Sequence, residues 1–226
     1  PRYSIIRQLP YERINTSMKA MTMCSDCSNE YGDALDRRHY SQTNSCNSCA
    51  IQMHLYDSSR NELSNEPAEI FNRLQTALLA GSIVAVKGIG GYLLLCDACN
   101  ENAIRNLRRR KQRPAKPFAL LYENISMAEK DVNITVEERK LLESKVAPIV
   151  LCPVKKKPST GINSDAIAPG LCKIGLMLPC SPLLLIISKE FGKPLVATSA
   201  NLSGSPVIYM DADALLKLPG IADLIL

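Results

Sequence analysis

Four cysteines near the amino end occur as two Cys-x-x-Cys pairs, and this pattern is typical of a metal site. Cys24 and Cys27 form the first pair, Cys46 and Cys49 the second, and residues 28–45 separate them. Each pair brings two thiolates to one point, so two pairs complete a tetrahedral four-sulfur shell for Zn²⁺. This shell has no open position for water, so the predicted role of the zinc is structural.

The remaining cysteines and the histidines indicate no second metal site. Five other cysteines lie scattered through apolar stretches, where free thiols pack as small hydrophobes in a reducing compartment. Cys96 and Cys99 form a further Cys-x-x-Cys, but no partner pair follows it. His39 and His54 are expected at the surface, and an iron–sulfur cluster stays the alternative at the four-cysteine site.

A run of basic residues is the second feature that can do chemistry. Seven Lys and Arg side chains occur without an intervening acid: Arg105, Arg108, Arg109, Arg110, Lys111, Arg113 and Lys116. They account for the formal net charge of +5. Pro114 and Pro117 stiffen the end of the run, so we expect Lys111, Arg113 and Lys116 to project from a rigid turn toward a polyphosphate. A solvated helix face is the alternative.

A third feature is ATSANLSGSP (197–206), which follows an apolar stretch. It carries four small hydroxyl or amide side chains: Thr198, Ser199, Asn201 and Ser203. Such side chains, together with Gly204, allow backbone amides to approach a nucleotide closely. KGIGG (87–91) is also rich in Gly, but it matches neither a P-loop nor a dinucleotide-binding fingerprint. With only two histidines, the sequence offers no Ser-His-Asp or Cys-His arrangement, which argues against hydrolases of those classes.

Alternating apolar and amphipathic segments predict an α/β fold with a mixed twisted sheet and flanking helices. Strands are predicted over residues 82–87, 92–96, 117–122, 148–152, 173–178 and 194–199. Helix starts are predicted at Pro67, after Asn100, at capping boxes beginning with Ser126 and Thr135, and at Pro182 behind Ser181. Residues 153–170 are expected to form a mobile loop.

We place a domain boundary after residue 60, in a polar stretch that reads as a linker (51–66). A small zinc-finger module (1–60) then precedes a nucleotide-binding domain (61–226). The chain shows no apolar leader and no apolar run of membrane length, so we expect a cytoplasmic protein without a membrane span.

Several segments together resemble the HypF carbamoyltransferases of nickel–iron hydrogenase maturation. KGIGGYLLLCDA, RRRKQRPAKPFALL, IAPGLCKIGLMLPCSPL and ATSANLSGSP are similar to the YrdC-like domain of that family. MCSDCSNEYGDALDRRHYSQTNSCNSC resembles the second of its two zinc fingers, and PRYSII the strand after the first. The resemblance covers nearly the whole chain. It implies a fragment, because the family carries an acylphosphatase-like domain and a first finger before this region and a peptidase-like domain after it.

The resemblance implies structural Zn²⁺, and ATP with Mg²⁺ as substrate. In the family, carbamoyl phosphate is hydrolysed to carbamate at the acylphosphatase-like domain. Carbamate and ATP then form carbamoyl adenylate and pyrophosphate in the YrdC-like domain. The carbamoyl group passes through the last domain to a HypE-type acceptor protein, where it becomes a cyanide ligand. This chain is expected to hold only the adenylation step.

Family motifs carry over onto single residues of this chain. Lys-x-Arg-x-x-Lys-Pro falls on residues 111–117, so Lys111 and Arg113 are the expected catalytic residues and, with Lys116, the expected grip on the triphosphate. Residues expected to bind the nucleotide or the small acyl substrate also include Lys87, Tyr92, Ser181, Thr198, Ser199, Asn201 and Ser203.

The chain departs from the family pattern in two places, and two other functions stay open. Ala50 replaces a glycine after the finger, and Leu184 and Leu185 stand where the family often has histidines. A threonylcarbamoyl-adenylate synthase of tRNA modification shares the YrdC-like motifs, but the finger and KGIGGY argue against it. A non-catalytic RNA-binding module is the other alternative, although three Phe and no Trp supply few stacking platforms.

Overall fold

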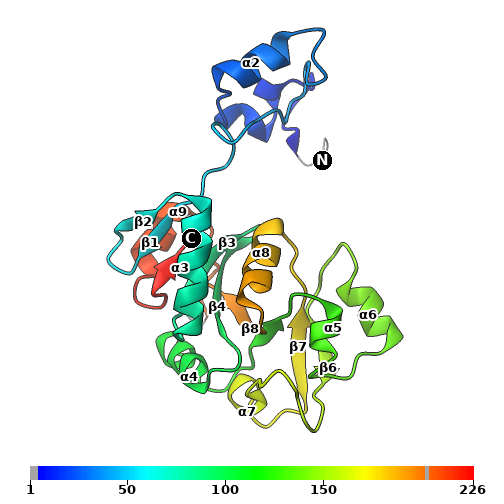
Figure 1. The fold of residues 1–226 in the computed structure, drawn as a ribbon, viewed down its shortest axis with the longest axis vertical. Coiled ribbons are helices and arrows are strands. Elements are labelled where there is room, and N and C mark those ends of the chain that lie inside the picture. The colour runs from blue at the N-terminus through cyan, green and yellow to red at the C-terminus, as the bar shows by residue number, and fades with distance from the viewer. Residues whose placement is uncertain (1–4, 202–203) are drawn as a thin grey trace. The chain divides into compact units, whose positions relative to one another are not determined.

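The structure is a computed structural model that describes residues 5–201 and 204–226. The chain divides into two compact units, Pro1–Met53 and His54–Leu226, which we call the small unit and the large unit (Figure 1). No helix of the described residues is long and apolar enough to cross a membrane.

A buried arginine organises the small unit. Its helices include η1 (Arg13–Asn15), η2 (Ser17–Ala20) and α2 (Ser25–Gly32). The Arg13 guanidinium donates to the carbonyl oxygens of Met21, Gln42 and Asn44 at 2.8, 2.8 and 3.0 Å. These bonds tie the segment before the first cysteine pair to the segment before the second. The strand expected for residues 1–6 lies mostly outside the described residues, and Ile6 makes a single antiparallel bridge with Thr16.

The large unit is built on a nine-stranded mixed sheet in the order β2-β1-β9-β3-β4-β8-β5-β7-β6. The strands are β1 (Leu55–Asp57), β2 (Glu62–Ser64), β3 (Val84–Gly88), β4 (Gly91–Asp97), β5 (Ala119–Leu121), β6 (Val150–Pro153), β7 (Lys173–Met177), β8 (Leu195–Ser199) and β9 (Leu224–Ile225). Among the described strands, β3–β9 and β5–β7 pair in parallel and the other pairs are antiparallel. The predicted mixed α/β sheet is confirmed, and β1 and β2 lie within the stretch that we read as a linker.

Seven helices flank the described part of this sheet: α3 (Pro67–Leu79), α4 (Glu101–Arg110), α5 (Ile125–Ala128), α6 (Val136–Leu142), α7 (Ser164–Ile167), α8 (Pro182–Phe191) and α9 (Asp211–Lys217). Asn100, Thr135 and Ser181 cap their helices as predicted. The capping box at Ser126 is wrong, because the Asn124 side chain accepts the Met127 N–H and begins α5 earlier.

The segment 153–170 is more ordered than predicted. It contains α7, and the buried Asp131 carboxylate accepts the backbone N–H groups of Ser159 and Thr160 at 2.9 and 3.0 Å. The Tyr122 hydroxyl donates to the same carboxylate at 2.9 Å. The segment is therefore anchored to the core at its centre.

One face of the sheet packs on the main core, and the other face is covered only in part. Leu94, Leu120, Ile174 and Val196 are fully buried in a core shared with α4, α5, α7 and α9. On the other face, α3 and α8 pack together in front of β3 and β4 (Figure 1). Farther along, Leu151 of β6 is 61% exposed, although its strand neighbours Val150 and Cys152 are buried. This partly open face is where a ligand can reach the sheet.

Candidate functional site

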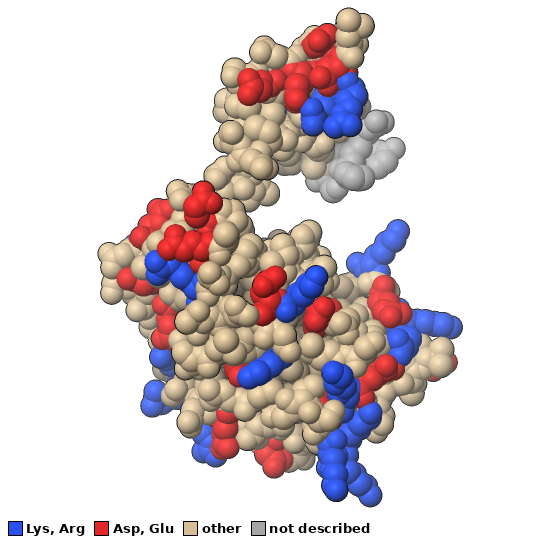
Figure 2. Space-filling view, viewed as in Figure 1, with Lys and Arg blue, Asp and Glu red and all other residues tan. Residues whose placement is uncertain are grey.

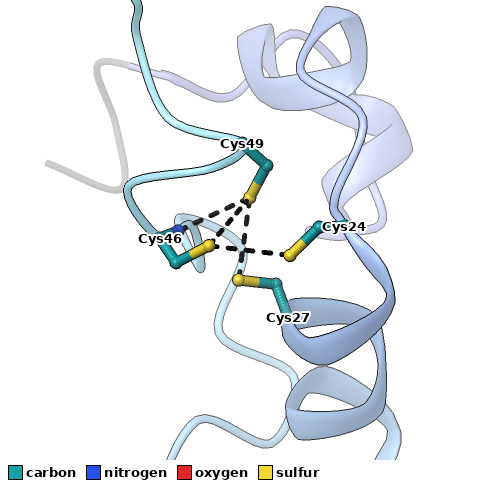
Figure 3. A group of neighbouring side chains, drawn as sticks. All are labelled: Cys24, Cys27, Cys46 and Cys49. Atoms are coloured by element: carbon teal, nitrogen blue, oxygen red, sulfur yellow. Dashed lines mark hydrogen bonds between the residues drawn. The ribbon is translucent and has the colours of Figure 1, made fainter. Parts of the chain in front are cut away.

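The four predicted metal ligands converge on one point in the small unit (Figure 3). Their Sγ atoms lie within 4.8 Å of one another, with 3.6 Å from Cys24 to Cys46, 3.6 Å from Cys27 to Cys49 and 3.9 Å from Cys46 to Cys49. Four sulfurs at tetrahedral corners around Zn²⁺ lie roughly 3.8 Å apart. The donor set and its spacing therefore match a closed tetrahedral metal site.

Local geometry explains how each pair is positioned. Cys24 immediately precedes α2 and Cys27 lies in its first turn, while the Cys49 N–H donates to the Cys46 carbonyl at 3.1 Å. The pKa of Cys46 is lowered to about 6. The largest cause is a backbone hydrogen bond with Ser48, and the next is a hydrogen bond with the Cys24 thiol. The thiolate is the form that binds metal. Among the described residues, no histidine joins this cluster.

A cavity of about 710 Å³ lies over the open face of the sheet in the large unit. Its floor is formed by Ala197, Ala119 and Gly175, which are direct partners on the adjacent strands β8, β5 and β7. A Cβ atom at Gly175 would lie 2.9 Å from Ile149 Cγ2 and 3.6 Å from Ala119 Cβ. These small side chains keep the floor flat, and the volume is in the range of small-molecule sites.

Polar groups line one end of this cavity. Arg113, Thr198 and Ser199 lie there, and the Arg113 Nη1 atom is 3.4 Å from Thr198 Oγ1. Burial lowers the pKa of the Arg113 guanidinium, although an arginine keeps its charge in proteins. Lys173 is also among the lining residues, and among the described residues no Asp or Glu lines the cavity. The cavity thus combines a flat apolar floor with a cationic end.

Lys111 lies beneath the loop that follows β8 and is 1% exposed. Its Nζ donates to the carbonyl of Ser199, to the carbonyl of Asn201 at 2.7 Å and to Asn201 Oδ1 at 2.8 Å. Burial, followed by the charges of Arg113 and Lys116, lowers its pKa to about 8. Lys111 is not among the lining residues, and its contacts hold the Ser199–Asn201 segment in place.

Lys87 and Tyr92 are cross-strand partners on β3 and β4, and their side chains share one face of the sheet. Leu93, the next residue, lines the cavity, so Lys87 and Tyr92 belong to the opposite face. There the Tyr92 hydroxyl donates to Asp211 Oδ1 at 2.8 Å, and Lys87 forms an ion pair with the same carboxylate. The structure does not bring this pair to the cavity.

The other predicted residues differ in their surroundings. The Ser181 hydroxyl accepts the Leu184 N–H at 3.4 Å and caps α8. The Lys116 residue is exposed, and its carbonyl accepts hydrogen bonds from two arginines. The Asn201 side chain also donates to the Ser205 carbonyl. Ser203 lies outside the described residues.

Most of the basic run is occupied by contacts within the chain. Arg105 pairs with Glu101 on the exposed side of α4, and Arg110 donates to Asp223 Oδ1 at 2.7 Å. Arg108 donates to backbone carbonyls. On the face drawn in Figure 2, many Lys and Arg side chains lie beside Asp and Glu. The buried part of the run thus serves contacts within the chain.

Two family models match this chain. The family model described as Telomere recombination, which covers Sua5, YciO and YrdC proteins, matches residues 76–226. The chain belongs to this family. A second family model, the HypF finger, matches residues 23–56. This range includes all four clustered cysteines.

Similar proteins match either nearly the whole chain or a part of it. The carbamoyltransferase HypF of Rhodobacter capsulatus is 40% identical to this chain over 223 residues. The match covers 99% of this chain and 29% of that protein. A crystal structure of full-length HypF in the phosphate- and nucleotide-bound form is 38% identical, with a TM-score of 0.80 over 100% of this chain and 29% of that one. The threonylcarbamoyl-AMP synthase of Vibrio cholerae is 27% identical over 63% of this chain and 76% of its own length.

These matches confirm the resemblance to HypF, and the chain spans 29% of the length of the HypF relatives. They also confirm a YrdC-like α/β unit that accompanies a HypF-type finger. The sequence indicated Arg108 only as one member of the basic run, and did not indicate Asp211 or the cavity floor. The pairing of Ala119 with Gly175 and Ala197 depends on strand order, which no local sequence signal reveals.

Proposed function

We propose that the large unit binds ATP in its cavity and joins it to carbamate, as the adenylation step of a HypF-type carbamoyltransferase. The observation that carries this proposal is the shape and charge of the cavity. A flat floor of Ala197, Ala119 and Gly175 suits a planar base, and Arg113 with Thr198 and Ser199 suits phosphate at one end. The HypF relatives at up to 40% identity support the assignment.

In this proposal Arg113 is the residue that contacts the phosphates directly. Its guanidinium presents a planar donor fork that matches phosphate oxygens. Lys116 and Ser203 are proposed as further phosphate contacts, although Lys116 is not among the lining residues and Ser203 lies outside the described residues. Lys111 and Asn201 act on the loop that carries Ser199. No lining carboxylate is available among the described residues, so Mg²⁺ would be held by phosphate oxygens and water.

The proposed reaction is a displacement at the α-phosphorus of ATP. A carbamate oxygen attacks this phosphorus, the bond from phosphorus to the bridging oxygen of the β-phosphate breaks, and pyrophosphate leaves with the bonding electron pair. Arg113 stabilises the negative charge that develops on the phosphoryl oxygens. The N–H groups at the start of α8, where Ser181 is the cap, favour an anion nearby. Lys87 and Tyr92 hold Asp211 on the other face.

The product would be passed on outside this chain. In the longer HypF relatives the carbamate is proposed to arise from carbamoyl phosphate, and the carbamoyl group to move to a HypE-type acceptor. The chain spans 29% of the HypF of R. capsulatus, so these steps belong to the whole protein.

In the small unit, Cys24, Cys27, Cys46 and Cys49 would hold one Zn²⁺. Bound zinc supplies structural cross-links between α2 and the Cys46–Cys49 turn. A segment of this length has little core of its own, and metal binding contributes directly to its folding.

Exchange of radioactive pyrophosphate into ATP tests the proposal. We expect exchange with the zinc-loaded chain in ammonium carbamate solution, and none in ammonium chloride. Exchange that requires L-threonine together with bicarbonate would favour the threonylcarbamoyl-adenylate synthase instead, a reading that the V. cholerae relative supports. RNA binding with a steep salt dependence and without ATP binding would favour a nucleic-acid-binding module.

A further inference from the structure

Arg108 is engaged differently from the neighbouring arginines of α4. Its guanidinium donates to the carbonyl oxygens of Ala166 and Ile167 at 2.9 and 2.8 Å, and to those of Arg113 and Lys116 at 3.0 Å each. The first two carbonyls belong to the end of α7 and the other two to the turn that carries Arg113. Arg108 therefore joins this turn to α7.

Arg108 and Arg113 also share two partners. Arg113 Nε donates to the Lys116 carbonyl at 3.3 Å, the same oxygen that Arg108 contacts. The buried Phe118 ring lies 4.4 Å from Arg108 Cζ and 5.1 Å from Arg113 Cζ, as cation–π contacts require. Phe118 is in turn fixed by its backbone, because its N–H donates to the Ile167 carbonyl at 3.0 Å.

The two guanidinium groups are held together although they repel each other. Burial, followed by the charge of Arg113, lowers the pKa of Arg108. Among the described residues, neither guanidinium forms an ion pair with a carboxylate. Backbone carbonyls and one aromatic ring thus supply the contacts that keep two cations close, at a point where one of them lines the cavity. Such an arrangement is organised before an anion arrives, which lowers the entropic cost of binding it.

We propose that Arg108 is a positioning residue for Arg113. It fixes the turn of residues 113–117 against α7, and so keeps the Arg113 guanidinium at the polar end of the cavity. Phe118 contributes to the same positioning, because its ring contacts both guanidinium groups. This inference rests on the proposed function, because its readout is the contact between Arg113 and the phosphates of ATP.

The test is a double-mutant cycle on ATP affinity, measured by isothermal titration of the zinc-loaded chain. Arg108→Lys keeps the charge but loses the planar fork, so the Kd for ATP is expected to rise about tenfold, as for one lost charge-assisted hydrogen bond. If Arg108 acts through Arg113, the same substitution in the Arg113→Ala background raises the Kd less than about twofold. A residue with a general structural role would show no such coupling.

Arg110→Lys is the matched control. Arg110 lies on the same helix, is part-buried and donates to the Ile221 carbonyl at 3.1 Å, away from the turn. The Arg110→Lys substitution is expected to leave the Kd for ATP unchanged. If Arg108→Lys does not fold, Phe118→Leu serves instead and is expected to show the same coupling to Arg113→Ala.

Two outcomes overturn the inference while the proposed function stands. One is an equal loss of affinity in the Arg113→Ala and wild-type backgrounds, and the other is an equal effect of Arg108→Lys and Arg110→Lys. Failure of the wild-type chain to bind ATP would instead overturn the proposed function, and this inference with it.

Discussion

Lys111 gives the sharpest prediction about stability, because the structure buries its ammonium group completely beneath the loop after β8. Burial and the nearby Arg113 and Lys116 charges lower its pKa from 10.5 to about 8. The buried ammonium group donates hydrogen bonds to Ser199 and Asn201, but these bonds do not fully offset the free-energy cost of removing its charge from water. We therefore predict that the fold gains stability when Lys111 loses its proton.

The magnitude follows from the two pKa values. Between pH 8 and 10.5 the unfolded chain keeps the Lys111 proton while the folded chain releases it, so the free energy of unfolding rises with pH in this window. A fall in pKa from 10.5 to about 8 corresponds to about 3 kcal/mol. Below pH 8 both states are protonated, and the full cost of the buried charge is present.

The assay compares wild type with Lys111→Met, which keeps the length of the side chain and removes the titrating group. Urea unfolding of the large unit is followed for both proteins from pH 7 to pH 10.5. All other groups titrate in both, so the difference between the two unfolding free energies isolates Lys111. We expect wild type to gain about 3 kcal/mol relative to the variant. A difference that stays constant with pH would refute the reasoning.

Three further predictions concern the metal site and the cavity. Cys46→Ser should abolish zinc binding, as measured by elemental analysis, and leave the calorimetric transition of the large unit in place, whereas loss of both transitions would contradict two independent units. Gly175→Val should raise the Kd for ATP at least about tenfold with an unchanged circular dichroism spectrum, because its side chain enters the cavity floor beside Ile149. Lys87→Ala should change that Kd less than about twofold, since its partner Asp211 is on the opposite face of the sheet, and a larger loss would place the nucleotide there.

Local sequence signals predicted those elements whose structure is decided locally. The strands β3 to β8 follow apolar runs, and Asn100, Thr135 and Ser181 cap helices in the ordinary way. At α5 two nearby residues could act as cap, and the structure uses Asn124 rather than Ser126. The strands β1, β2 and β9 have only two or three residues each, so their conformation depends on partners that are distant in the chain.

The candidate site was predictable in its residue types but not in its geometry. The motif around Lys111 and Arg113 pointed to phosphate, yet both carry the same charge and only Arg113 lines the cavity. Which of them is buried depends on how the end of α4 meets the Ser199–Asn201 segment. Likewise Asp211 is paired with Lys87 from the far end of the chain, and no sequence spacing indicates that contact.

The central claim is that a nucleotide occupies the cavity over β5, β7 and β8, and a crystal structure of the zinc-loaded chain with a non-hydrolysable ATP analogue tests it most directly. We predict phosphate density within hydrogen-bonding distance of Arg113 and Thr198, with the base over Ala119 and Gly175. Nucleotide density beside Lys87 and Asp211, or an empty cavity at saturating analogue, would contradict the account.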